Sequence, residues 1–265
     1  MLRVGSRFAF LIALLSGALS AEPPAGASSR EAEALIDAMV EAHGGRELWA
    51  AAPTVSFEDE FKRGEADSGL VSRVTVEQGR RRAYIDFPGS EMRLAWNGEK
   101  AWSESWTLAY PPRFLALLNY YFLNLPWMAK DPGIILGEPG TARLWDDPTE
   151  YVTVKLTYEE GVGDTPDDYF LLYLHPETHR LKACEYVVTY RALLPDGVEA
   201  ADPHVLVFDE YSTVDGLTVP THYTIYESDR TLYGSCDIRN WSLRKPFDES
   251  RMIMPQGAVL DESTP

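Results

Sequence analysis

The stretch YFLLYLHPETHRLKACEYVVTY, residues 169–190, contains two runs of strand length on either side of His175-Pro-Glu-Thr-His179. Two histidines four residues apart with a glutamate between them can bind zinc when they share one face of a helix. Pro176 lacks a backbone donor and favours a turn, and the flanking runs are rich in Tyr, Leu and Val, which are typical of strands. The stretch therefore predicts a β-hairpin with a polar turn rather than a metal site.

These two strands are apolar or aromatic on both faces. Phe170, Leu172 and Leu174 point to one side of the first strand, while Leu171 and Tyr173 point to the other. In the strands of an antiparallel sheet with one solvent-exposed face, apolar and polar residues alternate instead. We therefore expect an N-terminal helix to cover one face and a helical insertion to cover the other, and the sheet to curve around an apolar interior.

Most of the remaining chain has the two-residue period of strands. Val55, Phe57 and Phe61 alternate with polar residues, and Asn97-Gly98 indicates a two-residue hairpin turn. Further strands are expected near residues 70–76, 83–87, 92–96, 141–145, 150–159, 168–174, 180–191, 204–213, 219–227 and 231–243. The pattern predicts a mainly β fold (α+β) with a single curved antiparallel sheet of about ten or eleven strands.

Two segments have helical character. A helix from about residue 31 ends at Gly44-Gly45, since glycine accepts the left-handed conformation of a C-cap, and a short one follows before Pro53. Residues 111–136 are apolar on every side, so a helix there must be buried by a larger surface. Asn119, Asn124 and Pro126 break this apolar run, which argues against a membrane span.

The N-terminus has the features of a Sec-type signal peptide over residues 1–21. Arg3 and Arg7 precede the apolar stretch FAFLIALLSGAL, and small residues predict cleavage after Ser20 or Ala21. No cysteine lies at that point, so we expect an exported, soluble periplasmic protein without a lipid anchor. We divide the rest into a flexible leader (22–30), one domain (31–250) and a C-terminal tail (251–265).

The chain is strongly acidic. It has 24 basic and 41 acidic residues, and removing the two arginines of residues 1–21 leaves 22 against 41. Nucleic acids and anionic head groups require basic patches, so this balance disfavours both as partners. We expect a monomer without stable membrane insertion and without a cofactor.

Four stretches resemble an uncharacterised family of exported bacterial proteins that has a LolA/LolB-like lipoprotein-carrier fold. They are EAHGGRELW (41–49), YYFLNLPWMAKDPG (120–133), GVGDTPDDYFLLYLHPETHRL (161–181) and DGLTVPTHYTIY (215–226). The resemblance implies an incomplete barrel with a hydrophobic cavity, closed by helices that move when an acyl chain enters. The carrier family's cavity-mouth residues do not transfer, because no stretch here matches those motifs residue by residue.

This reading makes the protein a non-catalytic carrier or sensor of a lipid or acyl chain, such as that of a lipoprotein. Burying a sixteen-carbon chain contributes at most about 12 kcal/mol, too much for reversible binding unless a helix competes for the same space. The candidate lid residues are Phe114, Leu117, Leu118, Tyr121, Phe122, Trp127 and Met128. The candidate wall residues are Trp96, Trp102 and Trp106. For any single one of the ten, an ordinary core position is the favoured alternative, since large apolar residues are mostly just buried.

The sequence leaves other interpretations of these residues open. Asp164, Asp167 and Asp168 form a weak calcium candidate, but their spacing lacks the regular ligand pattern of a known calcium loop, and acidic turns with Gly and Pro are common. Cys184 and Cys236 would pair in an oxidising compartment or remain buried free thiols. The five histidines are scattered and no nucleophile motif is present, so nothing in the sequence demands an enzyme. An interaction module that binds an envelope protein or a peptide through an edge strand is the main alternative.

Overall fold

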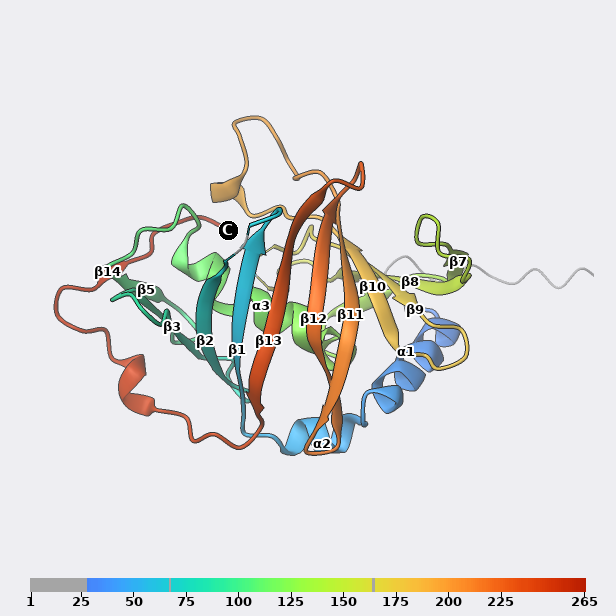
Figure 1. Cartoon of the computed structure of the whole chain (residues 1–265), viewed down its shortest axis with the longest axis horizontal. Helices are drawn as coiled ribbons and strands as arrows, with labels where there is room; N and C mark the ends of the chain where they lie inside the picture. Colours follow the sequence, from blue (N-terminus) through green and yellow to red (C-terminus); the bar gives the residue numbers. More distant parts are fainter. Residues whose placement is uncertain (1–27, 67, 164) are drawn as a thin grey trace, which may run out of the picture.

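The computed structural model describes residues 28–66, 68–163 and 165–265, so the expected signal peptide and most of the leader lie outside the described residues. Within these described ranges, fourteen strands form one antiparallel sheet (Figure 1). The strands are β1 (Thr54–Arg63), β2 (Leu70–Glu77), β3 (Ala83–Asp86), β4 (Arg93–Trp96), β5 (Ala101–Glu104), β6 (Ile134–Leu136), β7 (Gly140–Ala142), β8 (Tyr151–Tyr158), β9 (Phe170–Leu174), β10 (Leu181–Tyr186), β11 (His204–Val214), β12 (Leu217–Glu227), β13 (Leu232–Ser242) and β14 (Val259–Leu260). The helices are α1 (Arg30–Ala42), α2 (Arg46–Ala51) and α3 (Pro112–Met128), with short 3-10 turns η1 (Arg191–Leu193) and η2 (Glu249–Met252).

The sheet consists of two meanders joined through β1 and β13. Its strand order is β14-β5-β4-β3-β2-β1-β13-β12-β11-β10-β9-β8-β6, with β7 also paired to β8. The chain leaves β5 near one end of this order and re-enters at β6 on the other end. The segment between them contains α3, so the connection itself carries a helix across the sheet (Figure 1).

The expected fold class is confirmed: the protein is mainly β, with one curved antiparallel sheet that does not close into a barrel. The sheet has more strands than the ten or eleven predicted. Two of the additional strands, β6 and β14, contain three and two residues, which is too short for a period of two to be recognised.

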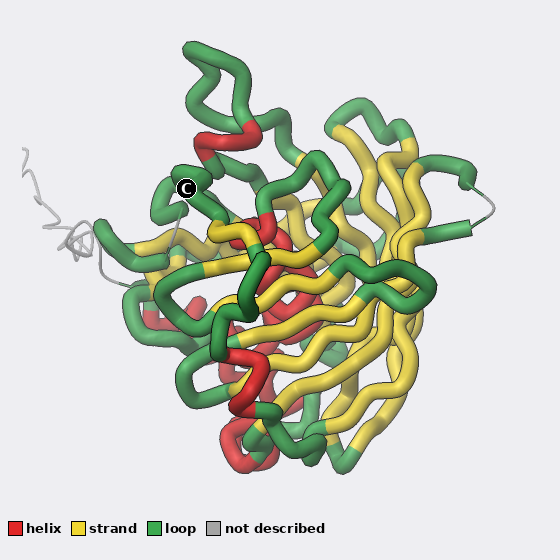
Figure 2. The backbone as a smooth tube through the Cα atoms, turned by 90° about the vertical axis from the view of Figure 1, so that its left-hand side faces the viewer, coloured by secondary structure: helices red, strands yellow, loops and turns green. Residues whose placement is uncertain are grey.

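Irregularities in the central strands accompany the curvature. The register shifts within β1 between Ser56 and Glu58, within β11 around Glu210, and within β12 between Ile225 and Tyr226. A β-bulge bends its strand and increases the local twist. These shifts allow the central strands to wrap around α3, which Figure 2 shows inside the curve of the sheet.

The main core lies on the concave face, and both α1 and α3 pack there. Ile36 and Met39 of α1 belong to the same buried cluster as Tyr120 and Leu123 of α3. The expectation that these helices cover opposite faces is therefore wrong. The convex face is covered by loops and by the C-terminal segment, which can bury an apolar patch without a helix.

Two smaller clusters lie on the convex face. One contains Tyr151 and Tyr173 under Leu144 and Trp145. The other contains Tyr84, Ala95 and Trp102 against Phe247, Met252 and Ala258. The prediction that strands such as β9 are covered on both sides is thus confirmed, with loops as the cover.

The segment 175–180 is the polar turn of a hairpin, as predicted. Nδ1 of His175 accepts the backbone N–H groups of Glu177 and Thr178 at 3.2 and 3.3 Å, so this ring stabilises the turn. Among the described residues, no group of three or more His, Cys, Asp or Glu side chains is placed to hold a metal ion.

Helix α3 spans 17 residues and continues through Asn119, Asn124 and Pro126. Pro112 occupies its first turn, where a missing N–H costs no helical hydrogen bond. Within the described ranges, no helix is both long enough and apolar enough to span a bilayer.

Candidate functional site

A cavity of about 310 Å³ lies between the N-terminal half of α3 and the concave face of the sheet. Its walls are mainly apolar, for example Val74 on β2, Ile85 on β3 and Ile225 on β12. Leu70 and Tyr110 line it and are 40% and 39% exposed, so they mark its mouth. Other lining residues, such as Val74 and Tyr223, are almost completely buried.

The helix contributes one face to this cavity. Phe114, Leu118 and Phe122 lie four residues apart and all line it, as expected for side chains stacked along one side of a helix. These three are among the seven predicted lid residues. Asn119 lies on the same side and adds a polar group.

The other four predicted lid residues are placed elsewhere. Leu117 and Tyr121 are partly buried against the main core and do not line the cavity. Trp127 and Met128 are buried in the last turn of α3. The Trp127 ring stacks on Trp49 of α2 at 4.6 Å between centroids, so this end of α3 is anchored rather than free.

The three tryptophans predicted as walls do not line the cavity. Trp102 lies in the convex cluster beside Tyr84. The Arg113 guanidinium lies over the Trp96 ring, and Trp106 packs its edge on Phe87. Smaller aliphatic residues and aromatic residues such as Phe61 and Tyr186 form the walls instead.

A polar cluster closes the deep end of the cavity. The Ser72 hydroxyl donates to Oδ1 of Asp59, and Nδ2 of Asn119 donates to Oδ2. Tyr223 donates its hydroxyl hydrogen to Oδ1 of Asn119 at 2.8 Å. The cluster therefore joins β1, β2, α3 and β12 around one carboxylate.

Asp59 was not singled out from the sequence, although a signal was present. It occupies the same side of β1 as Val55, Phe57 and Phe61, so a carboxylate stands in the apolar phase of a strand. Ser72 occupies the equivalent position between Leu70 and Val74 on β2. A polar residue within an apolar series is the pattern that would have identified both.

Burial dominates the electrostatics of Asp59, which is 2% exposed. Desolvation raises the pKa of its carboxyl to about 6, against the hydrogen bonds from Ser72 and Asn119, which favour the ionised form. The carboxylate is therefore mainly ionised at neutral pH and becomes protonated under mildly acidic conditions.

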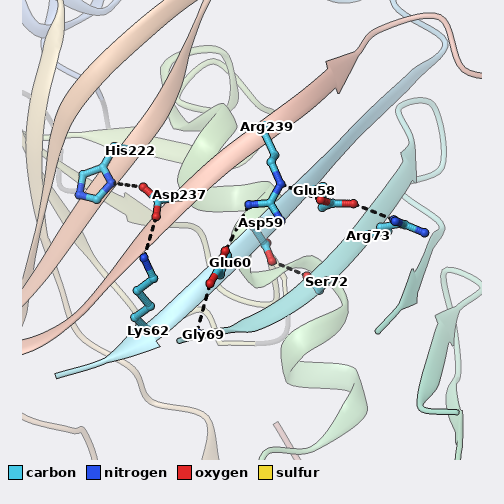
Figure 3. A network of polar contacts seen from close by, with 10 residues as sticks. All are labelled: Glu58, Asp59, Glu60, Lys62, Gly69, Ser72, Arg73, His222, Asp237 and Arg239. Atoms are coloured by element: carbon cyan, nitrogen blue, oxygen red, sulfur yellow. Dashed lines mark hydrogen bonds and ion pairs between the residues drawn. The ribbon is translucent and has the colours of Figure 1, made fainter. Parts of the chain in front are cut away.

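The same strand carries an ion-pair ladder on the convex face (Figure 3). Glu58 accepts from Arg73 and from Arg239, both at 2.7 Å, and Arg239 also reaches Glu60 at 3.3 Å. Asp59 points the other way, toward Ser72 (Figure 3). Neighbouring residues of β1 thus point to opposite faces of the sheet. Glu58 belongs to the ion-pair network on the convex face, and Asp59 is the buried carboxylate on the concave face.

The acidic loop offers little support for calcium. Asp164 lies outside the described residues. Asp168 accepts hydrogen bonds from the hydroxyl of Thr165 and from the N–H and hydroxyl of Thr189, so its oxygens already have partners that hold the loop.

Cys184 and Cys236 are buried free thiols, so the disulfide alternative does not hold in this structure. They lie on β10 and β13, with β11 and β12 between them. Three strand spacings amount to roughly 14 Å, and a disulfide needs Cα atoms within about 7 Å. Neither thiol lines the cavity.

Comparison with protein families gives a match over half of the chain. The model described as "Family of unknown function (DUF6503)" matches residues 57–193, which run from within β1 to the end of η1 and include α3. No curated protein sequence matches the chain with significance.

Solved structures provide a fold comparison. A DUF1329 family protein from Desulfovibrio piger ATCC 29098 has a TM-score of 0.54 and 12% identity, over 85% of this chain and 98% of that one. The LolA superfamily protein NE2245 from Nitrosomonas europaea has a TM-score of 0.49 and 11% identity, over 84% of this chain and 97% of that one. A putative outer membrane lipoprotein-sorting protein domain from Vibrio parahaemolyticus has a TM-score of 0.49 and 8% identity, over 78% of this chain and 93% of that one.

At these identities the similarity concerns the fold alone. The chain shares the fold of the DUF1329 family protein, and a LolA superfamily protein is among the similar structures.

Proposed function

The chain belongs to the family of unknown function DUF6503, and we propose that it binds the apolar chain of a lipid or lipoprotein between α3 and its sheet. It acts in this proposal as a non-catalytic carrier or sensor. The observation that carries the proposal is the apolar cavity of about 310 Å³ beneath α3.

The size of the cavity suits part of an acyl chain. An apolar cavity of about 150 Å³ takes up benzene, so on the same scale this one holds roughly twelve carbon atoms. Burying twelve methylene groups contributes about 10 kcal/mol at most, before the costs of ordering the chain and of moving α3. Micromolar binding corresponds to about 8 kcal/mol, so reversible exchange is compatible with this cavity.

Helix α3 supplies the element that makes the binding reversible. Its first half lines the cavity through Phe114 and Leu118, whereas its last turn is anchored by Trp127 on Trp49. We expect the first half to move outward as a longer guest enters and to refill the space when the guest leaves. This movement offsets part of the burial free energy.

The proposed site of action is the periplasm. The N-terminal sequence pattern of residues 1–21 supports export, and the surplus of acidic residues would keep the protein off anionic membrane surfaces. A carrier must release its cargo without adhering to the bilayer, so the charge balance fits this role.

The decisive experiment is lipid extraction from protein purified out of its native envelope, followed by mass spectrometry. The wild-type protein is expected to carry acyl material in roughly stoichiometric amount. Leu118→Trp places a large side chain in the cavity and should reduce the recovered lipid several-fold. Leu117→Trp changes a neighbouring residue of α3 that does not line the cavity, and it serves as the matched control.

Recovery of no acyl material, together with no binding of added long-chain amphiphiles, would reject the proposal. A co-purified peptide or envelope protein bound at a sheet edge would favour the interaction module instead. Equal lipid content in the Leu118→Trp and Leu117→Trp variants would place the lipid outside this cavity.

A further inference from the structure

The deep end of the cavity is chemically different from its walls. Asp59, Ser72, Asn119 and Tyr223 all line it and are linked by hydrogen bonds around one carboxylate. Asp59 and Tyr223 are 2% and 1% exposed, so the cluster meets the cavity and not the solvent. A purely apolar guest has no interaction with these groups.

The carboxylate has unused acceptor capacity. An ionised carboxylate accepts about four hydrogen bonds through its two oxygens. The Ser72 hydroxyl donates to Oδ1 and the Asn119 amide donates to Oδ2, and the backbone N–H of Ser72 contributes a third hydrogen bond to the carboxylate. Capacity for a further donor therefore remains, and the cavity is the space from which such a donor would come.

Asp59 also lacks a cation inside the cavity. Among the described residues that line the cavity there is no lysine and no arginine. Arg239 lowers the pKa of Asp59 only weakly, from the convex face, where it binds Glu58 and Glu60. A buried charge without a partner is costly, so a guest that donates a hydrogen bond or brings a positive charge gains affinity there.

Tyr223 and Cys236, which lie near Asp59, are neutral around pH 7. Burial raises the pKa of the Tyr223 hydroxyl and of the Cys236 thiol well above their ordinary values. His204 also lines the cavity, and its Nε2 atom lies 3.0 Å from the Glu227 carboxylate. Tyr110, Tyr186 and Tyr233 also line the cavity.

We propose that the guest carries a hydrogen-bond donor, a hydroxyl or an ammonium group, at the end that lies deepest in the cavity, and that Asp59 accepts this donor. The inference rests on the proposed function and adds the class of guest. It excludes guests whose innermost end is a carboxylate, because that group would face Asp59 in a low-dielectric site.

The test uses three probes with the same ten-carbon chain: 1-decanol, decylammonium and decanoate. Calorimetric titration of the wild-type protein at pH 7.5 is expected to give at least about tenfold tighter binding for the first two than for decanoate. In Asp59→Asn the affinity for decanoate rises while that for decylammonium falls. Opposite signs for two probes cannot result from a general loss of structure.

The matched control is Glu60→Gln, which removes a carboxylate from the next residue of β1 on the convex face. This variant should keep the wild-type order of the three probes. If Glu60→Gln changes the affinity order of the three probes as Asp59→Asn does, the effect comes from the overall charge of the protein. That result would overturn the assignment.

A second measurement covers the case in which Asp59→Asn does not fold. With a pKa of about 6, roughly one tenth of Asp59 is ionised at pH 5, so the affinity advantage of decylammonium over 1-decanol should shrink by about tenfold from pH 7.5 to pH 5. His204→Gln removes the histidine that lines the cavity and should retain this pH dependence. An unchanged ratio in both proteins would overturn the assignment.

The outcomes separate the two proposals. If all three probes bind equally well to the wild-type protein and to Asp59→Asn, the donor assignment fails and the hydrophobic guest stands. If none of the probes binds, the proposed function itself fails.

Discussion

Asp59 is a buried carboxylate that lines the cavity. It is the carboxylate in an apolar series on β1, and it faces the cavity through a cluster that includes α3. Its pKa of about 6 lies above its ordinary value because burial disfavours the charged form. The folded state therefore holds a proton there more tightly than the unfolded chain does.

The first prediction concerns pH and Asp59. Stability from this group is fully present below the unfolded pKa of 3.8 and is lost as the pH rises through about 6, a change of about 3 kcal/mol. Asp59→Asn removes this dependence, so it should destabilise the protein more at pH 4.5 than at pH 7.5. Urea unfolding at both pH values measures the difference, and equal effects at both would contradict the assignment.

His43 gives the opposite pH dependence. It follows α1 and is completely buried, with Nδ1–H donating to the carbonyl oxygen of Thr218 at 2.9 Å and Nε2 accepting the N–H of Leu181 at 3.2 Å. The ring therefore ties α1 to β12 and β10 as a neutral tautomer. Burial lowers its pKa to about 4, against the hydrogen bond to Thr218.

The second prediction follows from this linkage. Stability from His43 is present above pH 6.5 and is lost as the pH falls toward 4, again by about 3 kcal/mol. His43→Gln should cost roughly 1–3 kcal/mol at pH 7.5, because at least one buried partner loses its hydrogen bond. The cost should shrink at pH 4.5 in the same urea experiment, and a larger cost at pH 4.5 would refute it.

At the scale of elements, α3 is the part that differs most from an ordinary sheet connection. It runs inside the curve of the sheet, where Asn119 ties it to Asp59 and Tyr223. Its last turn is held to helix α2 by the stacking of Trp127 on Trp49. Gly44, which follows α1, allows the chain there to pack closely against the turn before β12. A Cβ atom at this position would lie 2.4 Å from the carbonyl oxygen of Gly216.

The third prediction tests the tie at Asn119. Asn119→Ala leaves Asp59 and Tyr223 each without one partner, which should cost about 1–3 kcal/mol. Amide hydrogen exchange in the first half of α3 should become faster. Asn124→Ala is the control on the same helix, because its side chain donates to the carbonyl oxygen of Tyr120 within α3. Equal acceleration in both variants would show that Asn119 does not hold the helix to the sheet.

At the scale of the whole molecule, one continuous sheet separates two environments. Its concave face encloses the helices and the cavity, while its convex face carries the ion pairs around Glu58 and two apolar patches covered by loops. These ion pairs reach solvent through Arg73 and Arg239 and contribute little each, so burial on the concave face supplies most of the stabilisation. Both cysteines belong to that concave core.

The fourth prediction uses these thiols as reporters of the whole sheet. Burial raises the pKa of Cys184 and Cys236 above the ordinary value, so the native protein holds unreactive neutral thiols. A thiol reagent such as 5,5′-dithiobis(2-nitrobenzoate) should label neither in native buffer and both in denaturant. Labelling should follow global unfolding, and fast labelling of one thiol in native buffer would indicate local opening.

The amino-acid sequence by itself determined the class of the fold. The period of two in β1 and β2, the doubly apolar strand β9 and the all-round apolar character of α3 predicted a curved antiparallel sheet around a buried helix. Three of the predicted lid residues, Phe114, Leu118 and Phe122, line the cavity. These patterns are local, because side-chain periodicity depends only on the neighbouring residues of the same element.

The tertiary structure alone decided which elements share a face. Pairing of β1 with β13 places β5 and β6 far apart, so the chain must cross the concave side and α3 joins α1 there. The strand order also brings Asp59, Ser72, Asn119 and Tyr223 together from four elements, and it separates Cys184 on β10 from Cys236 on β13. Contacts between residues distant in sequence depend on strand order and register. The side-chain periodicity within a single element does not encode either of them.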